Sequence, residues 1–162
     1  MMEHLDREIN TFESLLARDG RLVYKTRGIS MKPMLHENRD LVIICVPEGR
    51  LRPYDVALYR RGSAYVLHRV IHVRERDYLI RGDNTYHMES VPDSAVIGVL
   101  TGFKRKGKEY SVQDPVYRWY VRIWCAIYPV RAIIVFLLWK AKVVARKLGI
   151  SRKNLKTIYK KL

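Results

Sequence analysis

Three side chains in this 162-residue sequence have the types that nucleophilic hydrolysis by a serine requires. Ser30 lies in the segment 28–34 (GISMKPM), His68 in a run of β-branched residues, and Asp83 in the tripeptide 82–84 (GDN). A serine hydroxyl becomes a nucleophile when a base accepts its proton, and an imidazole is a better base when a carboxylate orients it. The sequence therefore offers a nucleophile, a base and an orienting carboxylate in that order.

The segment around Ser30 has the residues of a constrained turn. Gly28 can adopt a backbone conformation closed to other residues, and Pro33 fixes its own φ and restricts the residue before it. Short apolar runs at 22–24 and 41–46 flank the segment. On the segment alone, a loop that only joins two strands is the simpler interpretation; the histidine and the carboxylate downstream favour a nucleophile.

His68 is the candidate base. A free imidazole has a pKa of about 6.5, so it is mostly neutral and able to accept a proton near pH 7. The residues leave the orienting carboxylate open, because Gly-Asp-Asn is also a turn sequence in which Asp83 would only brace a loop. Glu89 is a second carboxylate that would share or replace the role of Asp83.

Five short blocks of this sequence resemble motifs of the signal peptidase I family and occur in the same order as in that family. The family shares its superfamily with the self-cleaving SOS-type repressors. The resemblance is to the archaeal and endoplasmic-reticulum branch, in which histidine stands where bacterial members use lysine. The blocks span about half of the chain, and each alone is a weak match. They are 30–33 (SMKP), 54–59 (YDVALY), 68–71 (HRVI), 82–84 (GDN) and 96–99 (VIGV).

The resemblance implies a peptidase in which Ser30 forms an acyl-enzyme, His68 is the general base and Asp83 orients it. It also implies that the Ser30 N–H stabilises the oxyanion. Many bacterial relatives add a hydroxyl two positions earlier, where this chain has Gly28, so another backbone N–H replaces that hydroxyl or the stabilisation is weaker. Met31 and Met34 would form an apolar shelf for the substrate or line the core.

The sequence predicts three regions. Residues 1–20 read as an amphipathic helix, formed by residues 3–19 and ended by Gly20. Residues 21–113 contain short β-branched runs separated by turn residues and no helix of crossover length, which predicts a mainly β fold, an antiparallel barrel-like catalytic domain. Residues 114–162 form a basic, hydrophobic helical tail. Cys45 and Cys125 lack the spacing of a zinc or disulfide framework, and no cofactor or metal is predicted.

The net charge of +15 comes mainly from the tail, because residues 116–162 contain twelve Lys or Arg and no Asp or Glu. The predicted helix 116–147 is apolar between 123 and 139 except for Arg131, and it contains Pro129. Trp and basic residues flank this stretch, which favours a segment lying on a membrane surface over a kinked span or a soluble partner-binding helix. Nucleic acid is a less suitable partner, because the centre of the tail is apolar.

The favoured interpretation is a membrane-associated serine endopeptidase that acts on precursor polypeptides. The alternative is a catalytically idle member whose fold serves as a binding or scaffold module. A self-cleaving repressor would need a lysine base and a DNA-binding domain, and the motifs supply neither. Residues 1–20 are charged and lack the apolar run of a signal peptide, which slightly favours the cytoplasmic face.

Overall fold

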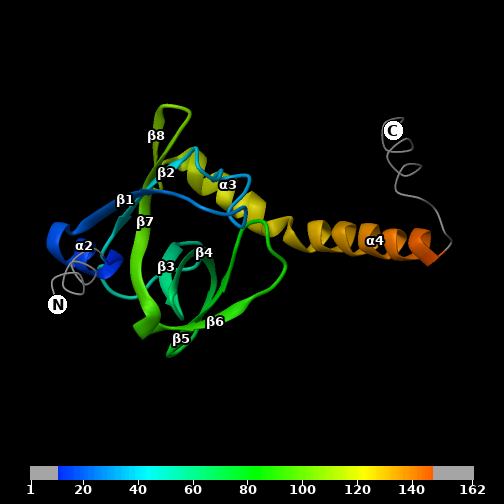
Figure 1. The fold of residues 1–162 in the computed structure, drawn as a ribbon, viewed down its shortest axis with the longest axis horizontal. Helices are drawn as coiled ribbons and strands as arrows, with labels where there is room; N and C mark the ends of the chain where they lie inside the picture. Colours follow the sequence, from blue (N-terminus) through cyan, green and yellow to red (C-terminus); the bar gives the residue numbers. More distant parts are fainter. Residues whose placement is uncertain (1–10, 148–162) are drawn as a thin grey trace, which may run out of the picture. The chain divides into compact units, whose positions relative to one another are not determined.

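The computed structural model describes residues 11–147, and one antiparallel sheet with its connecting loops positions the candidate residues. The strands follow the order β1-β2-β7-β3-β4-β5-β6, and β8 pairs with β7. Figure 1 shows that the sheet is strongly bent. The strands are β1 (Arg21–Lys25), β2 (Leu41–Cys45), β3 (Val56–Arg61), β4 (Ala64–Val73), β5 (Asp77–Arg81), β6 (Glu89–Pro92), β7 (Val96–Arg105) and β8 (Lys108–Ser111).

The prediction of a mainly β, antiparallel fold is confirmed, but a closed barrel is not formed. Among the described residues, β1 pairs only with β2, β6 only with β5 and β8 only with β7, so these three strands are open edges and the sheet does not close on itself. Register shifts within three of the strand pairs bend the sheet without joining these edges, as β-bulges do. Closure would need β1 and β6 to pair with each other.

Seven of the strands fall on the short β-branched runs that the sequence predicts between residues 21 and 113. Glycine-containing turns form the β3–β4 and β7–β8 hairpins. Gly62 and Gly107 both have positive φ, in the two-residue connections from β3 to β4 and from β7 to β8. The strand β6 was not predicted. It has four residues and ends in a proline, which is tolerated at a sheet edge but weakens a strand pattern.

The helix α2 (Phe12–Asp19) packs on the sheet through the buried Leu16. The side chain of Thr11 caps its start, and Gly20, with φ 64°, ends it by donating its N–H to the carbonyl of Leu16. The predicted cap at Gly20 is therefore confirmed. The predicted beginning of this helix lies in residues 1–10, outside the described residues.

The C-terminal region contains two helices, α3 (Pro115–Ala126) and α4 (Tyr128–Lys147), where the sequence predicts one from 116 to 147. Pro129 explains the interruption, because proline lacks an N–H and is tolerated only in the first turn of a helix. The compact unit that contains the sheet extends through Cys125, and a second unit begins at Ala126. Thus nearly all of α3 belongs to the same compact unit as the sheet, whereas the sequence analysis assigned it to the tail.

In the region from residue 11 to residue 147, no single helix is long and apolar enough to cross a membrane. The residues 115–126 and 128–138 pass that test only when the two helices are counted together.

Candidate active site

The loop that carries Ser30 joins β1 to β2 and is tied to the loop after β5. The backbone N–H of Asn84 donates to the carbonyl of Ser30 at 2.7 Å, and the Asn84 side-chain amide donates to the carbonyl of Ile29 at 3.3 Å. Gly28 adopts φ 83°, the conformation predicted for it, and its N–H donates to the carboxylate of Glu37 at 2.9 Å. The loop is therefore fixed on both sides of the serine.

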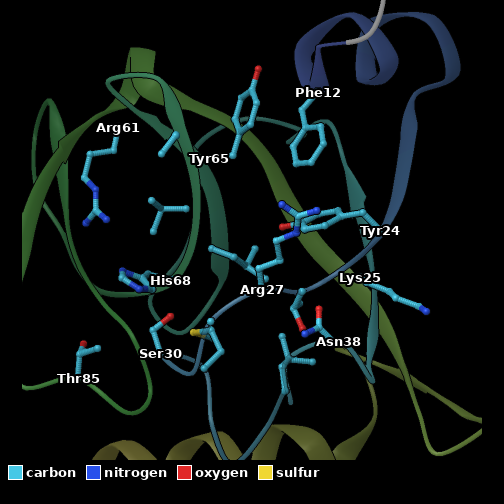
Figure 2. Close-up of a pocket in the computed structure, with 17 residues that line it drawn as sticks. Phe12, Tyr24, Lys25, Arg27, Ser30, Asn38, Arg61, Tyr65, His68 and Thr85 are labelled. Carbon is cyan, nitrogen blue, oxygen red and sulfur yellow. The ribbon is translucent and has the colours of Figure 1, made fainter.

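Ser30 and His68 meet across Gly82. A Cβ placed on Gly82 would lie 3.0 Å from both His68 Nε2 and Ser30 Cβ, so at most twice that distance separates these two atoms. Figure 2 shows the two labelled side chains close together at one end of a cavity. The nucleophile and base predicted from the sequence are thus neighbours, 38 positions apart in the chain.

Gly82 permits this close approach because it has no side chain, so its replacement by alanine should disturb both residues. In Gly82→Ala, the new methyl would meet the Ser30 carbonyl oxygen at 2.8 Å as well as the two atoms above. Because real Cβ atoms essentially never lie so close to a carbonyl oxygen, the Ser30 backbone must shift, and Ser30 Cβ and His68 Nε2 must also give way to the methyl. A misplacement of about 1 Å costs on the order of 10²-fold in rate. We therefore expect kcat to fall by about that factor or more.

The matched control is Gly62→Ala in the exposed β3–β4 turn, where an added Cβ meets no atom within 4 Å. That variant has an unfavourable positive φ but should retain wild-type kcat. Comparable kcat for wild type and Gly82→Ala, measured on folded protein, would show that Ser30 and His68 do not act together.

The other ring nitrogen of His68 contacts Glu89. Nδ1 lies 3.1 Å from Glu89 Oε1 and 3.2 Å from the Tyr59 hydroxyl, which itself donates to the same carboxylate oxygen. Arg61 reaches the Glu89 carboxylate at 3.3 Å. Because a carboxylate only accepts hydrogen bonds, this contact places a proton on Nδ1 and leaves Nε2 free to accept one from Ser30.

Burial of His68 favours its neutral form. Burial lowers the pKa of His68, and the hydrogen bond and charge of Glu89 only partly oppose that effect. Burial alone would raise the pKa of Glu89, but hydrogen bonds from Tyr59, Arg61 and His68 outweigh it and hold that pKa below its usual value. Burial and the neighbouring Glu89 raise the pKa of Tyr59, which keeps its proton. At pH 7 the arrangement is a neutral imidazole beside an ionised carboxylate.

Asp83, the predicted orienting residue, is held by a different partner. Both of its oxygens accept hydrogen bonds from the guanidinium of Arg69 at 2.7 Å, and both side chains are buried. Arg69 also donates to the carbonyl of Tyr54 and to the hydroxyl of Tyr117. Glu89 rather than Asp83 therefore occupies the Nδ1 position, and Asp83 fixes the loop that supports Ser30.

A cavity of about 970 Å³ opens beside Ser30 and His68. Phe12, Tyr24 and Tyr65 line its opposite end (Figure 2), where Phe12 packs against both tyrosine rings. This volume lies at the upper end of the usual range for ligand pockets, about 300–1,000 Å³. The cavity is therefore large enough for several residues of a peptide.

The two methionines assigned to the substrate shelf differ in position. Met31 lines the cavity and also joins the buried core. Met34 lies in the core, where its sulfur accepts a hydrogen bond from Arg69, and it does not line the cavity. The structure therefore brings Met31 to the site and assigns Met34 to packing.

A donor for an oxyanion is present at the serine. Within residues 11–147, the backbone N–H of Ser30 has no hydrogen-bond partner, whereas the N–H of Gly28 is engaged by Glu37. A free N–H next to a nucleophile is the usual element of an oxyanion hole. Ser30 itself thus supplies the candidate donor, as the sequence analysis expected. Gly28 contributes only the positive φ that the turn before the serine requires.

Tyr59 and its contact with His68 were missed in the sequence analysis, although a signal for them existed. The two-residue turn after Arg61 sets the β3–β4 register, in which Ala57 pairs with His68. Tyr59 is then the diagonal neighbour of His68 on the same face, within reach of a long side chain. Reading the register from the predicted turn would have placed this hydroxyl beside the imidazole.

Comparison with known proteins adds no assignment, since no protein-family model and no curated protein matches the chain. The chemical interpretation therefore depends on the residues and their geometry.

Proposed function

We propose that this chain is a serine endopeptidase of the signal peptidase type, which removes a leader or signal segment from a precursor polypeptide. One observation carries the proposal: Ser30 and His68 approach each other across Gly82 at one end of a large cavity, with Glu89 on the second imidazole nitrogen. The five sequence blocks support the same family.

In the proposed reaction, His68 Nε2 accepts the proton of the Ser30 hydroxyl as its oxygen attacks the peptide carbonyl carbon. The resulting oxyanion accepts a hydrogen bond from the Ser30 N–H, and Glu89 stabilises the imidazolium. His68 then gives its proton to the leaving amine as the C–N bond breaks, which forms an ester on Ser30. A water molecule, deprotonated by His68, hydrolyses the ester and restores the serine.

The pH dependence follows from His68. Because burial holds the pKa of His68 below its ordinary 6.5, we expect kcat/KM to rise with pH, with the midpoint of its acid limb below pH 6.5. Glu89 raises the pKa of His68, so Glu89→Gln should move that limb to still lower pH. Initial rates of the wild type and of Glu89→Gln, measured at pH values on both sides of 6.5, test both statements. A midpoint above pH 6.5 in the wild type would exclude His68 in this environment as the base.

We also propose that the tail associates with a membrane surface. Large apolar side chains of α4 are exposed, among them Ile133, Phe136 and Leu137, each more than half exposed. Apolar surface of this kind together with basic residues is typical of segments that lie at a bilayer surface. Substrates would then be precursors that reach the same membrane face.

The test of the function is N-terminal peptide mass spectrometry on cells lacking the protein, complemented with wild type or with Ser30→Ala. We expect a set of new N-termini that appears with wild type and is absent with Ser30→Ala, and the flanking residues would reveal the substrate class. Full rescue of a deletion phenotype by Ser30→Ala would instead support the idle scaffold module.

A further inference from the structure

The helix α3 has an inner face that contacts the active-site supports and an outer face that is apolar. On the inner face, Val121 is buried and Trp124 Nε1 donates to the carbonyl of Asp83 at 3.2 Å. On the outer face, Val116 is 81% exposed, Trp119 65% and Ile123 54%. These three residues follow helical spacing and form one stripe, which we call the outer stripe.

Three arginines line a pocket of about 280 Å³ at the same helix. Arg118 and Arg122 are one turn apart on α3, and Arg52 comes from the connection between β2 and β3. None of the ion pairs among residues 11–147 involves any of the three. Asp55 also lines the pocket, and its carboxylate accepts the backbone N–H of Arg52 at 2.7 Å.

This composition is suited to a phosphate. Three guanidinium groups against one carboxylate leave the pocket with a net positive charge, and guanidinium binds phosphate oxygens through paired hydrogen bonds. On a helix with 3.6 residues per turn, Arg118 and Arg122 lie about 100° from the outer stripe, so they border it along one side. A phosphate held by the arginines would therefore be adjacent to an exposed apolar surface that contains a tryptophan.

We propose that this pocket binds the phosphate of an anionic phospholipid while the outer stripe enters the boundary between headgroups and acyl chains. A free phosphate would satisfy the arginines but would leave the outer stripe in water, whereas a lipid satisfies both. The inference extends the proposed membrane association to the unit that carries the active site. It is independent of the peptidase chemistry and of the exposed surface of α4.

The test uses the full-length chain with Trp139→Phe, so that the tail does not contribute fluorescence. Binding is followed by quenching of tryptophan emission by vesicles of brominated phosphatidylcholine with or without phosphatidylglycerol. The pocket variant carries Arg52→Gln, Arg118→Gln and Arg122→Gln. The matched control removes the same charge at three exposed sites outside the pocket, as Arg21→Gln, Arg76→Gln and Lys108→Gln. Circular dichroism confirms that each variant is folded.

We expect quenching that depends on phosphatidylglycerol and is lost in Trp119→Phe. About 1 kcal/mol for each basic residue near an anionic surface corresponds to roughly 100-fold weaker vesicle binding in the pocket variant, against less than fivefold in the control. Equal loss in both variants would assign the effect to overall charge and overturn the inference. Binding of inorganic phosphate that needs the three arginines, with unchanged vesicle binding, would identify a free phosphate as the ligand and overturn it too.

Vesicle binding also distinguishes a lipid site at α3 from membrane association through the tail. If the pocket variant binds vesicles as strongly as the wild type, the membrane association is due to α4 alone and the pocket is not a lipid site. No vesicle binding by the wild type would refute both.

Discussion

Replacement of Glu89 by glutamine is expected to lower kcat by about 10³- to 10⁴-fold while the fold is retained. The carboxylate holds a proton on His68 Nδ1, 3.1 Å away, and leaves Nε2 free to accept the serine proton. A glutamine amide can donate to Nδ1 instead, which moves the proton to Nε2 and favours the wrong tautomer. It also removes the negative charge that stabilises the imidazolium. The measurement is kcat on the peptide that the wild type cleaves fastest.

The control for this prediction is Glu89→Asp, which keeps the negative charge and should retain more activity than the glutamine variant. Asp83→Asn provides the opposing test, because Asp83 was the carboxylate favoured from the sequence. If Glu89→Gln loses less than tenfold in kcat while a folded Asp83→Asn variant is inactive, Asp83 orients the base and our assignment of Glu89 is wrong.

The second large effect is on stability. Arg69→Met should lower the free energy of unfolding by about 3–5 kcal/mol, the usual result of removing one partner from a buried ion pair. Arg69 is fully buried, and Asp83 would lose both of its 2.7 Å hydrogen bonds to the guanidinium. An ionised carboxylate that loses its guanidinium partner in the interior is costly, whereas methionine keeps most of the packing volume. Urea unfolding followed by circular dichroism measures the change.

Arg61→Met is the matched control, because it breaks an ion pair at the surface. The Arg61 side chain is 60% exposed, and it approaches Glu89 at 3.3 Å. Such pairs contribute about 0–1 kcal/mol, so its unfolding free energy should change little. The double variant Arg69→Met with Asp83→Leu should recover part of the loss, since both charges of the buried pair are removed. A loss below 1 kcal/mol in Arg69→Met would contradict the structural role assigned to this pair.

The meeting of Ser30 and His68 was predicted from the order of the motifs and their resemblance to the signal peptidase family, while the local structure of each motif could be predicted from the residues alone. Both lie in short motifs whose local structure depends on nearby residues: a turn restricted by Gly28, and a β-branched strand. The strand runs themselves were also predictable, because their turns contain residues with clear backbone preferences, as at Gly62 and Gly107. These features need no knowledge of distant contacts.

The choice between Asp83 and Glu89 could not be made in the same way. The two carboxylates are six positions apart, and their surroundings depend on how β6 pairs with β5. That pairing places Glu89 opposite Ile80, while a register shift in β4 between Val70 and His72 changes which residues face one another. The open edges of the sheet are likewise a property of long-range pairing. Local patterns carry little information about either.

The most direct test of the central claim is incubation of the purified chain with a proteome-derived peptide library, followed by mass spectrometry of the new N-termini. We predict that the wild type generates a consistent set of cleavage sites and that Ser30→Ala and His68→Ala, folded to the same extent, generate none of them. Removing the nucleophile should cost about 10⁶-fold. Cleavage at the same sites by Ser30→Ala at a comparable rate would contradict a serine mechanism at this site.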